Sequence, residues 1–437
     1  MKLDLTGVAR IAGVLGAIAL GTAGCIGSAP RRPVDRPTDL ARDTRPVSVN
    51  RPELDEKRLA EFGMDVYWDS HIRGETIARL QIEGASLYAI TDSHRIYQVD
   101  LHSGKVNWVY DVGVPIQFTE LERPISEFNY PKTEDGLQRY DEVYFVAKDT
   151  LYALDRKGGS DLWRLALPFG ASSPPQATAS HVLVGSWDDW IYAVKKSAGP
   201  VTWDWKWRTD GDVTARPGAE SPYAFIASSD GSLYTFDVVR GELQGQPFKT
   251  ERALTADPLI HKKLMYLGGE DMNLYVINVN DGRVEFRLPA GAPIKKRPVA
   301  IGNDVYVATE RVPGDKPEDP QHGVIALLRK GRVFNKTAHE LRWTRLKAER
   351  VLARGRESTY LLEPDLRGTI TFKKIVKVDA KEGAYRDELR PEGVDYYVTN
   401  PHDPNQRPPV PETLMGGIVF LGYRNGWVIA LKEKHEY

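Results

Sequence analysis

The sequence predicts an all-β fold: an eight-bladed β-propeller of four-stranded antiparallel blades, closed by pairing of an N-terminal strand with the last blade. Three observations predict it. A short strand motif recurs along the chain, each copy is followed by a tight turn and an aromatic strand, and one aromatic strand stands alone before the first full copy. With 41% hydrophobic and 10% aromatic residues, the 437-residue chain can fill the core of such a ring.

The recurring motif is an apolar strand that in its clear copies centres on a tyrosine. The tyrosines are 55, 40, 42 and 41 residues apart, and about 40 to 50 residues are typical of one propeller blade. The clear copies begin at Ile96, Leu151, Ile191, Leu233 and Leu274, and three weaker copies begin at Val324, Ile375 and Val428. Counting all eight copies predicts eight blades.

Turn residues surround each copy in the same order. A polar turn such as Ser229-Asp230-Gly231 precedes the tyrosine strand, and a glycine turn such as Ser103-Gly104-Lys105 follows it. Small turn residues between β-branched and aromatic runs are a hairpin signal. The next strand then begins near an aromatic residue: Trp108, Trp163, Trp203, Phe286 or Trp343.

This unit resembles the quinoprotein-type (PQQ-like) propeller repeat, whose consensus reads like "LYALD, two residues, TGK, W". The resemblance extends over roughly residues 67–437 and is strongest in the first three copies and the fifth. In that family the tryptophan docks between neighbouring blades. The resemblance therefore implies structural, blade-docking roles for Trp68, Trp108, Trp163, Trp203 and Trp343.

The two ends of the repeat region predict how the ring closes. Val66-Tyr67-Trp68-Asp69-Ser70 is an aromatic strand without a preceding copy, while the last copy ends at the C-terminus with no room for its own. If the first strand joined the last blade, no sheet edge would be left open to aggregation. We therefore expect the propeller to span 61–437.

The N-terminus predicts export. Lys2 and Arg10 precede an apolar run that is too short to span a bilayer comfortably, and Thr22-Ala23-Gly24 leads into Cys25, the single cysteine of the chain. This segment resembles a bacterial lipobox, which implies a signal peptide over 1–24, lipidation of Cys25 and an outer-membrane lipoprotein facing the periplasm. A plain secretory signal that happens to contain a cysteine is the alternative.

Residues 25–60 form the predicted tether. This stretch is rich in Pro and Arg and nearly free of large apolar residues up to about Glu56, so it cannot build a core. A solvated linker is favoured over a segment whose arginines rest on an anionic membrane surface. One short helical run is expected between Leu54 and Phe62.

The composition and motifs argue against catalysis. With 59 Lys and Arg against 60 Asp and Glu, no positive excess is available for nucleic acid. The nine histidines have no metal-binding spacing, no nucleophile elbow or phosphate loop is present, and acidic residues such as Asp188, Asp230 and Asp271 lie at turn positions. We therefore expect no catalytic residues, no metal and no cofactor.

The predicted function follows from a likeness in architecture. Signal, lipidated cysteine, tether and eight repeats resemble the outer-membrane assembly factors of the BamB family, which implies a monomeric, non-catalytic scaffold that binds a barrel-assembly component of the envelope. Insertions at 118–140, 311–321 and 389–411 are candidate contact loops, with Phe128 and Tyr130 as preferred contacts. The alternatives are a ligand sensor or carrier that uses the propeller channel and, less favoured, a quinone-dependent dehydrogenase.

Overall fold

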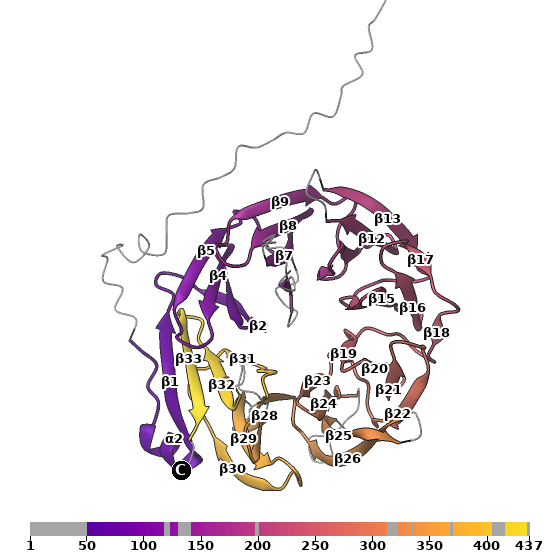
Figure 1. The fold of residues 1–437 in the computed structure, drawn as a ribbon. Coiled ribbons are helices and arrows are strands. Elements are labelled where there is room, and N and C mark those ends of the chain that lie inside the picture. Colours follow the sequence, from indigo (N-terminus) through magenta and orange to yellow (C-terminus); the bar gives the residue numbers. More distant parts are fainter. Residues whose placement is uncertain are drawn as a thin grey trace, which may run out of the picture. The chain divides into compact units, whose positions relative to one another are not determined.

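The computed structural model describes residues 50–117, 123–129, 141–196, 201–312, 322–333, 336–367, 370–403 and 416–434. Over these ranges the strands form eight antiparallel sheets, arranged as blades around a central axis (Figure 1). Seven of the sheets have four strands, and one has an additional short strand. The predicted eight-bladed propeller is confirmed.

The first four blades follow one another along the chain, each with its first strand nearest the axis. Blade one contains β2 (Ile77–Glu83), β3 (Ser86–Thr91), β4 (Arg95–Asp100) and β5 (Val106–Asp111); blade two contains β6 (Ser126–Phe128), β7 (Glu142–Ala147), β8 (Thr150–Asp155) and β9 (Asp161–Ala166). Blade three contains β10 (Gln176–Ala177), β11 (His181–Gly185), β12 (Trp190–Lys195) and β13 (Thr202–Arg208); blade four contains β14 (Gly218–Glu220), β15 (Tyr223–Ala227), β16 (Ser232–Asp237), β17 (Glu242–Leu243) and β18 (Phe248–Lys249).

The remaining blades repeat the pattern. Blade five contains β19 (Leu259–His261), β20 (Leu264–Gly268), β21 (Asn273–Asn278) and β22 (Val284–Pro289); blade six contains β23 (Val299–Ile301), β24 (Asp304–Ala308), β25 (Gly323–Val333) and β26 (Lys336–Leu346). Blade seven contains β27 (Arg350–Arg354), β28 (Ser358–Arg367), β29 (Ile370–Asp379) and β30 (Tyr385–Leu389); blade eight contains β31 (Tyr396–Val398), β32 (Ile418–Gly422), β33 (Trp427–Glu433) and β1 (Met64–His71).

The core lies between neighbouring blades. Strands such as β3 and β20 are buried along their whole length because another blade covers each face, which is why they read as continuous apolar runs. One core cluster, for example, joins Tyr88 and Ile90 of blade one to Phe145 of blade two. Each blade is therefore stabilised by its neighbours.

The ring closes as the sequence predicts. Strand β1 pairs antiparallel with β33, from Met64 opposite Glu433 to His71 opposite Trp427. In Figure 1 the indigo first strand lies beside the yellow last strands. The N-terminal strand thus covers the edge that the last repeat leaves open.

Helix α2 (Glu56–Phe62) precedes the closing strand and lies within the predicted helical run. The Asp55 carboxylate caps it by accepting the Arg58 backbone N–H at 2.9 Å, and Leu59 and Phe62 are buried against blades seven and eight. In the part of the chain that the structure describes, no helix has the length and apolar character needed to cross a membrane. The predicted signal peptide, Cys25 and the predicted tether up to residue 49 lie outside the described residues.

Candidate functional sites: projecting hairpins and the axial cavity

Three of the predicted docking tryptophans lie between blades. Trp68 donates its indole N–H to the Leu101 carbonyl at 2.8 Å, and Trp108 donates to the Arg156 carbonyl at 2.8 Å. Trp343 donates to the carbonyl of Ala380 at 3.2 Å. Each acceptor belongs to the glycine turn of the next blade, so the indole links two consecutive blades.

The same geometry explains the glycine of the repeat. Gly104 and Gly159 both have φ of +68°, which favours glycine. A Cβ on Gly104 would lie 2.6 Å from the Trp68 ring, and a Cβ on Gly159 would lie 2.6 Å from the Trp108 ring. Glycine therefore provides both the turn conformation and the space for the neighbouring indole.

In the third blade the indole that bonds to the glycine turn of the next blade belongs to Trp205, where the sequence predicts Trp203. Trp205 donates its indole N–H to the Val238 carbonyl of blade four at 2.8 Å, whereas Trp203 packs against Tyr192 of its own blade. The two tryptophans are two residues apart, and a register shift in the pairing with β12 places the second one opposite Ala193. The position of that bulge is a feature of the sheet, and sequence spacing did not reveal it.

Trp163 is half-buried, with its ring centroid 5.7 Å from that of Tyr144. The turn of the next blade falls in residues 197–200, outside the described ranges, so docking of Trp163 onto that turn stays a prediction. Phe128 lies on β6 as a half-buried ring, packed against the core cluster between blades two and three, with the Lys196 ammonium of blade three 4.1 Å from its centroid. Substitution of Phe128 is therefore expected to disturb packing. The sequence predicts Phe128 as a contact for a partner, which would require an exposed ring. Tyr130 lies outside the described residues.

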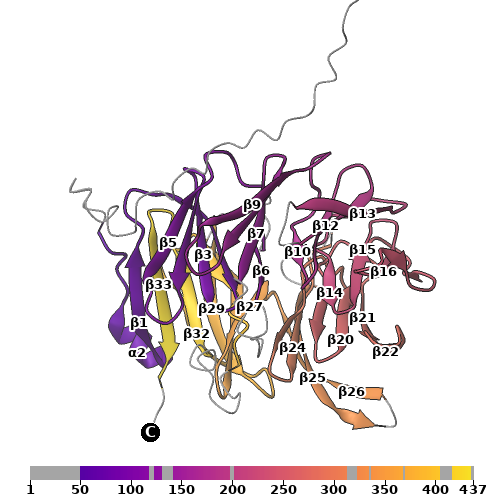
Figure 2. The same ribbon diagram turned by 45° about the horizontal axis from the view of Figure 1, so that its top comes forward.

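Two hairpins of blades six and seven are much longer than the others. Strands β25 and β26 have 11 residues each, and β28 and β29 have 10 each, whereas most second and third strands have five or six. Figure 2 shows β25 and β26 extending past the ring. Because successive strands of a blade run antiparallel, the β28–β29 turn faces the opposite side of the ring from the β25–β26 turn.

The end of the β28–β29 hairpin exposes three apolar side chains. Leu366 is 64% exposed, Ile370 59% and Phe372 45%. The Arg367 guanidinium lies over the Phe372 ring, 5.0 Å from its centroid. We refer to these residues, Leu366, Ile370 and Phe372, as the apolar tip. An apolar centre with a cationic rim is a feature of protein interfaces.

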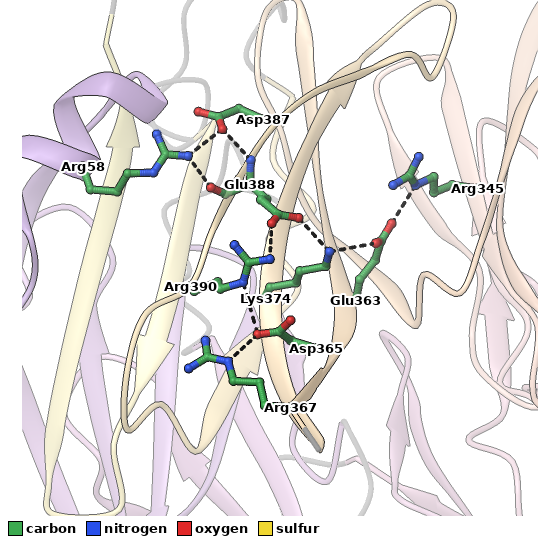
Figure 3. A network of polar contacts seen from close by, with 9 residues as sticks. All are labelled: Arg58, Arg345, Glu363, Asp365, Arg367, Lys374, Asp387, Glu388 and Arg390. Carbon is green, nitrogen blue, oxygen red and sulfur yellow. Dashed lines mark hydrogen bonds and ion pairs between the residues drawn. The ribbon is translucent and has the colours of Figure 1, made fainter. Parts of the chain in front are cut away.

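Ion pairs hold the lower part of this hairpin in place (Figure 3). Arg345 of blade six pairs with Glu363 at 2.6 Å, and Arg367 pairs with Asp365 at 2.8 Å. Lys374 pairs with Glu388 at 2.6 Å, and the network continues along β30, where Arg58 of helix α2 meets Asp387 at 2.5 Å. The hydrogen bond from Arg367, together with Arg390, lowers the pKa of Asp365. These ion pairs link the hairpin to β26 of blade six and to β30 of its own blade, and Arg58 extends the network to helix α2.

A cavity of about 640 Å³ lies on the axis of the propeller. The first strands of blades one, five, six, seven and eight contribute to its lining, and Leu362 and Lys373 of the long hairpin complete one wall. This volume falls within the range of about 300–1,000 Å³ that is typical of small-molecule sites. The cavity and the β28–β29 hairpin are therefore adjacent.

Arginines recur just before the first strands of blades two, four and six. Arg123, Arg216 and Arg297 each precede a proline at the start of a first strand, and Asp257 holds the same place in blade five. Residues at equivalent positions of different blades lie at the same height along the propeller axis. This recurring residue-proline pair was a sequence signal for the site, and we missed it.

One carboxylate in particular balances this positive charge. Glu83 accepts two hydrogen bonds from the Arg123 Nη2 at 2.7 and 2.8 Å, and its Oε1 lies 3.8 Å from the Arg216 Nη1. Burial alone would raise the pKa of Glu83, but Arg123 and Arg216 outweigh it and hold the pKa below its usual value. Asp257 accepts the Arg216 backbone N–H at 2.8 Å.

The quinone chemistry of the wider repeat family does not fit these residues. Within the described ranges no three His, Cys, Asp or Glu side chains converge to hold a metal ion, and the single cysteine is Cys25. The site therefore does not match a calcium–quinone centre flanked by cysteines. Its chemistry is that of guanidinium groups.

The comparisons with known proteins agree with this fold. The family model for the outer membrane protein assembly factor BamB matches residues 133–256. The crystal structure of BamB from Moraxella catarrhalis superimposes on 86% of this chain and 99% of its own, at 14% identity and a TM-score of 0.57. The chain is a PQQ-like propeller that resembles BamB.

Other propellers share the fold with BamB and this chain. The WD40 domain of SCAP from fission yeast covers 85% of this chain and 98% of its own at 9% identity and a TM-score of 0.53. The quinohemoprotein alcohol dehydrogenase from Comamonas testosteroni covers 89% and 79% at 11% identity, also with a TM-score of 0.53. No curated protein matches the chain. At these identities the likeness shows the fold alone.

Proposed function

We propose that this chain is a non-catalytic scaffold of the bacterial cell envelope that binds a protein partner in outer-membrane protein assembly. The observation that carries the proposal is the apolar tip, three exposed apolar side chains on a hairpin that a charge network holds in a fixed orientation. The family-model match over residues 133–256 and the likeness to BamB support the choice of pathway. The partner is a component of the barrel-assembly machinery.

Contact at the apolar tip gives the first prediction. A photo-crosslinking amino acid at Ile370 should capture a barrel-assembly component in intact envelopes, whereas the same probe at Val239, 62% exposed in blade four, should not. Replacing Leu366 and Ile370 with Ser should weaken binding of the captured partner about tenfold or more, because central apolar contacts dominate interface energies. Melting temperature should stay unchanged, since both side chains are exposed. Equal capture at the two probe positions, or unchanged binding by the Ser variant, would contradict the proposal.

Membrane attachment gives the second prediction. We propose that residues 1–24 are removed, that Cys25 carries the lipid, that residues 25–60 link it to the propeller, and that the mature protein faces the periplasm from the outer membrane. Replacing Cys25 with Ser should release the protein into the soluble periplasmic fraction, because the anchor is the lipid on its thiol. Fractionation followed by a salt wash is the measurement. A Ser variant that still sediments with membranes after the wash would show that another feature anchors the chain.

A further inference from the structure

The lining of the axial cavity has more cationic than anionic side chains: Arg79, Arg123, Arg297, Arg350 and Lys373 against Glu83, Glu349 and Asp395. At the level of the residue-proline pairs, Arg123, Arg216 and Arg297 face two carboxylates, those of Glu83 and Asp257. The Arg123 charge is balanced by Glu83, which accepts two short hydrogen bonds from the Arg123 guanidinium. One guanidinium is therefore left without a carboxylate of its own.

Arg216 is a buried member of this cluster and is incompletely bonded. Its side chain is 2% exposed, and its Nη2 donates to the backbone carbonyls of Arg123 and Ile125 at 2.5 Å. Its Nε and Nη1 have no hydrogen-bond acceptor among the described residues. A buried guanidinium with unsatisfied N–H groups is costly unless an acceptor is supplied from elsewhere.

Arg297 lines the cavity itself, together with Arg123 and Glu83. No hydrogen bond or ion pair joins its guanidinium to any residue in the described ranges. Burial, and then repulsion by Arg123, lower the pKa of Arg297 to about 9. The Arg297 guanidinium would therefore stabilise a negative charge bound in the cavity.

We propose that the axial cavity binds a small free oxyanion, a phosphate or a carboxylate, through the Arg297 guanidinium, with Arg123 and Arg216 supplying further positive charge. A planar guanidinium can hold such a group with two parallel hydrogen bonds. The cavity of about 640 Å³ has room for an organic molecule attached to the oxyanion. This site is separate from the apolar tip, so either can fail without the other.

Thermal unfolding and calorimetry of the purified propeller test the proposal, with inorganic phosphate and citrate as probes and chloride at equal ionic strength as the reference. Each probe that binds should raise the melting temperature with increasing concentration, because a ligand that binds only the folded state stabilises it by mass action. Arg297→Gln should weaken probe binding at least tenfold and remove the rise. Arg208→Gln should keep it, since the Arg208 side chain is 65% exposed on β13, away from the cavity.

The outcomes separate a binding role from a structural one. If Arg297 were only structural, Arg297→Gln would lower the melting temperature yet keep the response to the probes, and the proposal would be wrong. The absence of any response in the unaltered protein, to phosphate and citrate alike, would overturn it as well. If the Gln variant does not fold, Arg297→Lys decides: it keeps the charge but loses the two-pronged geometry, and its affinity should fall below that of the unaltered protein.

Discussion

Deleting residues 65–71 should abolish cooperative unfolding and drive the protein into aggregates. These residues make up most of β1, which pairs with β33 along its whole length. Without them Val428, Ile429 and Leu431, all fully buried, would lie on an unprotected sheet edge. In addition, blade one would lose the indole of Trp68 from its Leu101 turn. Circular dichroism during heating, together with size-exclusion chromatography, is the measurement.

The matched control removes residues 31–45, a stretch of the predicted tether, and should leave both the unfolding transition and the elution volume unchanged. If the two deletions behaved alike, closure of the ring by β1 would contribute little to stability. Partial loss of stability with a monomeric elution profile would mean that the edge of β33 is protected in another way.

Trp108→Ala should lower the free energy of unfolding by about 3–5 kcal/mol, the range for truncating a buried large aromatic side chain. Trp108 is 3% exposed and bonds to the Arg156 carbonyl of blade two, so the substitution removes an interblade hydrogen bond and leaves a cavity beside Gly159. Denaturant unfolding followed by far-UV circular dichroism measures the change. Trp187→Ala is the control, because Trp187 is 61% exposed, and it should change stability by no more than about 0.5 kcal/mol.

The third blade provides a second comparison within the same experiment. Trp205→Ala removes the bond to the Val238 carbonyl of blade four, whereas Trp203→Ala removes a contact with Tyr192 inside blade three. Trp205→Ala should therefore be the more destabilising of the two. If Trp203→Ala lowered the free energy of unfolding more than Trp205→Ala did, Trp203 would be the docking residue, as the repeat spacing predicts.

The repeat architecture was predictable because each copy carries its own local signals. Tyrosine strands such as Ile191-Tyr192-Ala193-Val194, glycine turns such as the one at Gly104 and the unpaired strand at Trp68 all depend on residues close together in the sequence. Blade count and ring closure follow from counting these signals. The short helix before β1 was predictable for the same reason, since its cap and its buried face lie within a few residues of each other.

The sites were harder to predict because they combine residues from different blades. Whether Trp203 or Trp205 docks is decided by a bulge opposite Ala193, and whether Phe128 is free is decided by Lys196 and the core cluster between blades two and three. The first is a pairing across one sheet and the second is a contact between two blades, and spacing along the chain specifies neither.

The sequence by itself therefore determined the repeat, the number of blades and the strand that closes the ring. Only the tertiary structure decided that Arg123, Arg216 and Arg297, up to 174 positions apart, meet around Glu83 at the axis, and that Leu366, Ile370 and Phe372 remain uncovered. The physical reason is that repeat signals are local, whereas burial and electrostatic balance depend on which blades surround a side chain.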